Sequence, residues 1–171
     1  MKLVVVSSAP IVILNNKKFM YAPYHKEMKI WAKYVDEIQF CCPIWKEDRG
    51  LLIDEISFPT EPIIPLKEFD ITRISKIPKA FLLSLANVLI LFKAMYKADH
   101  IHLRCPGNMT LLAAIVQVLF PRKTKTAKYA GNWDPKAKQP FTYKLQRWIL
   151  SNTFLTRNMQ VLVYGEWPNQ T

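Results

Sequence analysis

The chain has 171 residues, 50% of them hydrophobic and 22% charged, which suits one globular domain with its own core. Four glycines exclude a collagen-like or linker-like chain, and three cysteines without paired spacing exclude a disulfide scaffold or a zinc site. The net charge of +11 instead indicates an anionic partner, namely lipid headgroups, nucleic acid or a phosphorylated substrate.

The first part of the chain is predicted to begin with a buried strand. Residues 3–6 are aliphatic and fit a strand of a parallel sheet, and 7–18 are expected to form the loop over its carboxyl end. Residues 24–35 are predicted to form a helix, because Met28, Trp31 and Val35 recur at helical steps. Three short strands bounded by prolines are expected to follow: 38–42, 51–58 and 63–69.

Residues 79–97 form the most hydrophobic predicted helix. One face consists of large apolar side chains: Leu82, Leu85, Leu89 and Phe92. The opposite face is weakly polar: Ser84, Asn87 and Leu91. Because the helix is apolar nearly all round, we expect a core helix that is buried on both sides; the alternative is contact with a membrane or with another domain. Its uncharged stretch is shorter than the roughly 20 residues that cross a bilayer.

A strand, a turn, a helix and a second strand are predicted within residues 99–135. In 99–104, Ile101 and Leu103 alternate with a polar set, which comprises His100, His102 and Arg104. Residues 105–108 end this strand, 109–120 are predicted to be helical, and 125–130 are predicted to form the next strand. Such a unit normally joins neighbouring parallel strands.

Another amphipathic helix is predicted at 141–154, with Leu145, Trp148 and Ile149 facing inward, and a final strand at 159–164. Strands therefore alternate with helices throughout residues 1–171. This predicts a single α/β domain with a Rossmann-like, doubly wound, mainly parallel sheet and helices on both faces. Ligands of such sheets bind beyond the carboxyl ends of the strands, so a site is expected in the loops at 104–108 and 131–134.

The 99–135 unit resembles the amino-terminal domain of family 4 glycosyltransferases, which have the GT-B fold. Two motifs carry the resemblance, a strand of the form D-h-x-H-h-R-x-P-x-N before an apolar helix and a strand ending Y-A-G-N-W: His102, Arg104, Pro106, Asn108, Tyr129, Gly131, Asn132 and Trp133. The resemblance implies the acceptor-side half of an enzyme that moves a sugar from a nucleotide-sugar donor to a glycan or lipid-linked acceptor in surface polysaccharide synthesis. The nucleotide-sugar domain is expected to lie outside this chain, which alone should be inactive. No cofactor is expected besides the donor.

The resemblance and the predicted loops together indicate where the site residues lie; Ser8 and Asn15 are candidate donors in the first loop, where the family often has glycine. His102 and Arg104 are expected at the point of transfer, and six residues are expected to bind substrate: Ser8, Asn15, Tyr24, Asn108, Asn132 and Trp133. Arg104 has the planar fork that binds carboxylate or phosphate, with an ion pair to Asp134 or another carboxylate as the alternative. For Asn132 and Trp133 the alternative is a turn asparagine and a packed tryptophan. No metal site is expected, because His100 and His102 lack a third ligand nearby.

Two alternatives follow from the charge. One is a basic, non-catalytic module of α/β fold that binds a membrane surface or an anion, using helix 79–97 and four lysines: Lys17, Lys18, Lys76 and Lys79. The other is nucleic-acid binding, which is disfavoured because the basic residues of 122–138 lack aromatic residues suited to base stacking. The odd, unpaired cysteines favour a cytoplasmic protein, and the basic surface adds a peripheral location on the inner face of the membrane.

Overall fold

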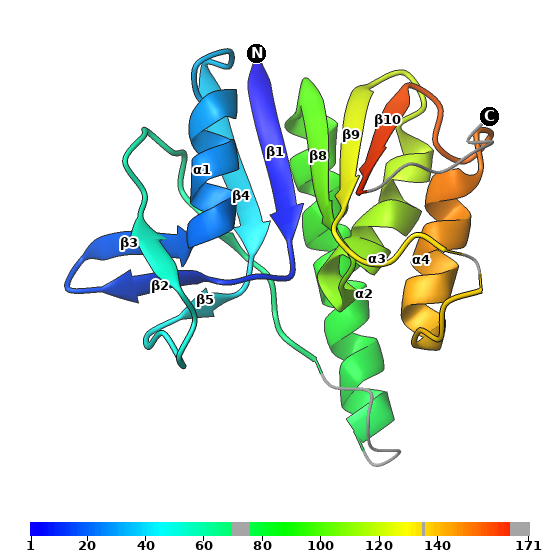
Figure 1. The fold of residues 1–171 in the computed structure, drawn as a ribbon, viewed down its shortest axis with the longest axis horizontal. Coiled ribbons are helices and arrows are strands. Elements are labelled where there is room, and N and C mark those ends of the chain that lie inside the picture. Colours follow the sequence, from blue (N-terminus) through cyan, green and yellow to red (C-terminus); the bar gives the residue numbers. More distant parts are fainter. Residues whose placement is uncertain (70–75, 135, 165–171) are drawn as a thin grey trace.

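A six-stranded sheet forms the centre of the computed structural model, which describes residues 1–69, 76–134 and 136–164 (Figure 1). Its strands, all parallel, are β1 (Lys2–Ser7), β4 (Glu37–Cys42), β7 (Ile64–Pro65), β8 (His100–Cys105), β9 (Thr124–Tyr129) and β10 (Met159–Val163). They stand in the spatial order β7-β4-β1-β8-β9-β10. Counted along the chain this is the order 3-2-1-4-5-6 of a Rossmann-type sheet, so the predicted α/β fold is confirmed.

Helices cover both faces of this sheet. Helix α1 (Ala22–Trp31) packs on one face, where Leu3, Val5 and Met28 belong to one buried cluster. The other three helices pack on the opposite face: α2 (Ile77–Lys97), α3 (Asn108–Val116, continued by a 3₁₀ turn at Gln117–Leu119) and α4 (Phe141–Ser151). Strand β1 is therefore buried on both faces, which is why its sequence is a continuous aliphatic run.

A second, four-stranded sheet lies beside the first, and its presence corrects two predictions. It comprises β2 (Ile11–Leu14), β3 (Lys17–Tyr21), β5 (Ile44–Trp45) and β6 (Ile53–Glu55), in the order β5-β2-β3-β6. The prediction of a loop over 7–18 is thus wrong for its second half, and the strand predicted at 51–58 belongs to this sheet. The hairpin forms because Asn15 and Asn16 both adopt positive φ (48° and 62°), as a tight turn between two strands requires.

Helix α2 is not the expected core helix, and the prediction that it is buried on both sides is wrong. Its weakly polar face packs inward through Asn87 and Leu91, whereas Leu82 and Leu89 are 67% and 63% exposed. The reason is that the buried Asn87 side chain forms two hydrogen bonds with the backbone of Lys67, at 2.9 and 2.8 Å. An amide whose hydrogen bonds are made costs little to bury.

The prediction for Trp148 of α4 is also wrong. The sequence predicts that this side chain faces inward, but it is exposed.

Lys125 of β9 is buried, and among the residues that the structure describes no carboxylate is paired with it. Its side chain is 1% exposed and its Nζ donates to Oε1 of Gln117 at 2.8 Å. Burial lowers the pKa of Lys125 to about 8. The charged form is therefore held in the core at a cost that depends on pH.

We expect the protein to become more stable as the pH rises above 8, and Lys125→Met to remove this gain. In the unfolded chain Lys125 titrates near 10.5, so between pH 8 and 10.5 the unfolded state binds more protons than the folded state. The free energy of unfolding then rises with pH, by up to about 3 kcal/mol over that interval. Urea denaturation at pH 7 and pH 10 measures it, with the exposed Lys33→Met as control. If the free energies of unfolding of the wild type and of Lys125→Met differ by the same amount at both pH values, the pKa of Lys125 is not lowered in the folded protein.

Candidate functional site

Arg104, at the end of β8, is held by Glu27 of α1. Its Nη1 lies 3.0 Å from Oε1 of Glu27 and its Nη2 lies 3.1 Å from Oε2. Its Cζ lies 3.5 Å from the centre of the Tyr24 ring, and Nζ of Lys128 lies 2.7 Å from Oε2 of Glu27. We call these four residues and His102 the Glu27 cluster. One carboxylate thus pairs with two cations, and the guanidinium is only 5% exposed. The carboxylate that pairs with Arg104 is therefore that of Glu27 and not that of Asp134.

His102 lies beside this ion pair as a neutral ring. Its Nδ1 is 2.7 Å from Oγ1 of Thr126, and its Nε2 is 4.0 Å from Oε1 of Glu27. Burial, with a smaller contribution from the nearby Arg104, lowers the pKa of His102 to about 3. Burial raises the pKa of Glu27, but hydrogen bonds from Arg104 and Lys128 outweigh burial, so its pKa lies below the ordinary value. The cluster therefore holds a neutral imidazole and an ionised carboxylate at neutral pH.

Three side-chain nitrogens of this cluster are buried without a hydrogen-bond partner. Within residues 1–69, 76–134 and 136–164 they are Nε2 of His102 and both Nε and Nη1 of Arg104, of which Nη1 still lies at ion-pair distance from Glu27. His100 shares the Thr126 hydroxyl with His102, at 3.0 Å. In the same part of the chain, no three His, Cys, Asp or Glu side chains are grouped to hold a metal ion.

A hollow of about 270 Å³ lies at the carboxyl edge of the parallel sheet, and we call it the switch-point hollow. It is lined by residues from several loops, from the start of α3 and from α4: Ser8, Pro43, Glu68, Phe69, Pro106, Gly107, Asn108, Met109 and Tyr143. Ser8 follows β1, and 106–109 follow β8. The strand order changes direction between these two strands, which is where doubly wound sheets bind ligands.

Two glycines of the 99–135 unit allow the loops at this edge to pack closely against one another. A Cβ on Gly107 would lie 2.1 Å from Oγ of Ser8, so only glycine lets the loop after β1 close on the start of α3. Oγ of Ser8 accepts a hydrogen bond from the backbone N–H of Met109 at 3.2 Å. A Cβ on Gly131 would lie 3.1 Å from Cγ of Pro106, so the loop after β9 rests on the loop after β8.

The remaining predicted site residues lie elsewhere. Asn132 is exposed and its Oδ1 accepts a hydrogen bond from the N–H of Asp134 at 2.8 Å, as in a turn. Trp133 is half-buried, and its ring lies edge-on to Tyr129 with the centroids 5.1 Å apart. These contacts match the alternative of a turn asparagine and a packed tryptophan. Asn15 lies in the hairpin turn at the outer end of the second sheet, away from α3 (Figure 1).

The structure thus separates the predicted site residues into groups. Ser8 and Asn108 come together in the switch-point hollow, while Tyr24, His102 and Arg104 belong to the Glu27 cluster. Sequence reasoning missed four residues at these places: Glu27, Lys128, Glu68 and Tyr143. Glu27 lies one helical turn before Trp31, on the face predicted to be buried, and this could have revealed it. Glu68 shortly follows β7, at the edge where ligands bind.

Comparisons with known proteins show a likeness of backbone only. No protein-family model matches the chain, and no curated protein matches its sequence. A solved structure described as UDP-N-acetylglucosamine 2-epimerase is similar over 88% of this chain and 39% of its own, with 12% sequence identity and a TM-score of 0.47. This chain therefore spans about two fifths of that protein's length.

Proposed function

We propose that this domain binds the acceptor of a glycosyltransferase that moves a sugar from a nucleotide-sugar donor to a glycan or lipid-linked acceptor, as in surface polysaccharide synthesis. The switch-point hollow carries the proposal, since it lies where the strand order changes direction. The motif resemblance supports it, because Pro106 and Asn108 of that motif line the hollow. We further propose that a separate domain binds most of the nucleotide-sugar.

The lining of the hollow suits a sugar. Asn108 offers an amide and Glu68 a carboxylate for sugar hydroxyls, while Phe69 and Met109 offer apolar surface for the carbon-bound hydrogens of the ring. Nε1 of Trp45 donates to Oε2 of Glu68 at 2.9 Å and orients the carboxylate. A sugar hydroxyl that donates to Glu68 would be the group poised to receive the transferred sugar.

Catalytic roles for His102 and Arg104 stay predictions. In the Glu27 cluster, the geometry supports a positioning role, since Arg104 anchors the end of β8 to α1 just before the loop that lines the hollow. Direct contact of Arg104 with a substrate would require its guanidinium to leave Glu27.

We expect Asn108→Ala to weaken sugar binding about fivefold, which is the loss of one hydrogen bond of about 1 kcal/mol. Saturation-transfer NMR and titration of the chain with a panel of mono- and disaccharides measure the affinity. Gln160→Ala is the matched control, since this amide is exposed on β10. A chain that binds none of the panel, or an Asn108→Ala chain that binds as the wild type does, would refute the assignment of the hollow.

A further inference from the structure

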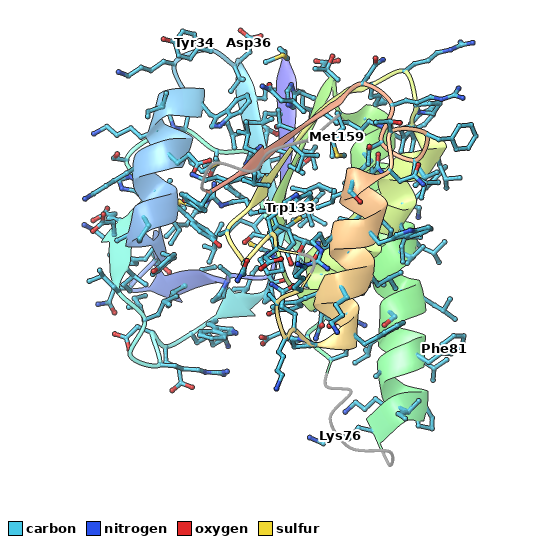
Figure 2. All side chains as sticks on the ribbon, turned by 45° about the vertical axis from the view of Figure 1, so that its right-hand side comes forward. Tyr34, Asp36, Lys76, Phe81, Trp133 and Met159 are labelled. Carbon is cyan, nitrogen blue, oxygen red and sulfur yellow. The ribbon has the colours of Figure 1, made fainter. Side chains whose placement is uncertain are left out.

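Helix α2 presents a continuous apolar stripe to solvent. Seven large side chains form it, each at least 41% exposed: Ile77, Phe81, Leu82, Leu85, Leu89, Phe92 and Tyr96. They recur mostly at three- and four-residue steps, so they share one side of the helix. Figure 2 shows Phe81 projecting away from the rest of the molecule. We call this set the α2 stripe, and a patch of this kind marks an interaction surface.

We propose that the α2 stripe docks on the surface of an anionic lipid bilayer, with α2 lying in the headgroup region. Charge complementarity supports this partner. The helix carries Lys79, Lys93 and Lys97, all exposed, and its sequence contains no acidic residue. At helical spacing these lysines lie along one flank of the stripe, where they would reach lipid phosphates while the apolar side chains enter the bilayer.

A shallow surface hollow near the end of α2 has the same character. Its volume is about 240 Å³, and two aromatic and two basic residues line it: Phe92, Lys93, Tyr96 and Lys97. Lysine ammonium groups beside aromatic rings suit a phosphate headgroup above its acyl chains.

Two other arrangements of α2 fit the structure less well. By length and composition the helix could cross a bilayer, but crossing would expose its packed face, where Asn87 is bonded to the backbone of Lys67. A second copy on the stripe would bring two lysine rows together in chains that each carry a net charge of +11. An anionic bilayer, by contrast, would bury the apolar side chains of the stripe and attract the lysines beside it.

The direction of α2 connects the stripe with the switch-point hollow. The amino-terminal part of α2 extends beyond the carboxyl edge of the parallel sheet (Figure 1). A hollow of about 240 Å³ beside Ala80 and Leu83 also includes Glu68 and Phe69, which line the switch-point hollow. Resting on the proposed function, we infer that the acceptor is lipid-linked, with its sugar in the switch-point hollow and its tail passing along Ala80 and Leu83 to the bilayer.

The test is co-sedimentation of the chain with phosphatidylcholine vesicles and with mixed phosphatidylcholine and phosphatidylglycerol vesicles. We expect binding at least about tenfold tighter to the mixed vesicles. A charge variant combines Lys79→Gln, Lys93→Gln and Lys97→Gln and should lose that preference. Its matched control combines three exposed lysines in and just after α1 and should bind as the wild type does: Lys26→Gln, Lys29→Gln and Lys33→Gln.

An apolar variant combines Leu82→Ser, Leu85→Ser and Leu89→Ser and should lose at least about tenfold in affinity for the mixed vesicles. Its control replaces three exposed apolar residues outside α2 and should bind as the wild type does: Ile30→Ser, Tyr34→Ser and Leu52→Ser. All six side chains are exposed, so thermal melting should show folded variants. Equal binding to both kinds of vesicle, or binding to neither, would overturn the proposal, as would dimerisation through the stripe without vesicle binding.

Sugar binding and vesicle binding test the proposed function and the docking surface independently. Asn108→Ala leaves the α2 stripe intact, so it should retain vesicle binding while losing sugar affinity. A chain that binds the mixed vesicles and no sugar would overturn the proposed function and the lipid-linked acceptor, and would leave the docking surface standing. A chain that binds sugar but no vesicle would overturn the docking surface alone.

Discussion

Glu27→Gln is expected to lower the free energy of unfolding by about 3 kcal/mol or more, measured by urea denaturation at pH 7. The substitution keeps the shape of the side chain but removes the anion with which Arg104 and Lys128 both pair. Arg104 is 5% exposed, so its guanidinium would stay buried without a counter-charge. Breaking a buried ion pair from one side is costly for this reason.

Glu55→Gln is the matched control for this substitution. Glu55 lies 2.9 Å from Lys17 in a pair that is about half exposed, and its loss should cost less than about 1 kcal/mol. Arg104→Lys keeps the charge but loses the fork to Glu27 and the contact with Tyr24, so it should also destabilise the protein. Equal effects of Glu27→Gln and Glu55→Gln would contradict the proposed role of the cluster. A stable Arg104→Lys protein with impaired sugar binding would instead assign Arg104 to the substrate site.

Acid should destabilise the protein through His102. The folded state holds its pKa at about 3, against an ordinary value of 6.5, because the ring is buried and lies beside Arg104. Between pH 6.5 and 3 the unfolded state therefore binds more protons, and the free energy of unfolding falls as the pH falls. The contribution of this one residue reaches about 3 kcal/mol at pH 4.

His102→Gln isolates this contribution, because glutamine can bond Thr126 but does not titrate. The variant should lose stability at pH 7 through poorer packing, and should lose less than the wild type on going from pH 7 to pH 4. Urea denaturation at both pH values measures the difference, and His25→Gln on α1 serves as control. If the wild type and His102→Gln lose the same stability between the two pH values, His102 is not buried in its neutral form.

Local patterns were enough to predict most of the central sheet. The aliphatic run of β1 and the alternation in β8 reflect burial on two faces, and both patterns can be recognised within one short segment of sequence. Because strands and helices alternate along the chain, their order also indicated the doubly wound class. The same rule predicts a site at the carboxyl edge, and Ser8 and Asn108 line the switch-point hollow there. Asn15 and Asn16 carried a local turn signal that was overlooked, and the second sheet was missed with it.

Other features depend on contacts between residues far apart in the sequence. Glu27 and Arg104 are separated by 77 positions and Ser8 and Met109 by 101, so no local pattern pairs them. The orientation of α2 shows the physical reason most clearly. Hydropathy favours burying Leu82, Leu85 and Leu89, yet Asn87 faces inward because the backbone of Lys67 satisfies its amide. Residue types along the chain determined which segments became strands and helices, whereas the assembled fold determined which side of α2 met the core and which stayed exposed.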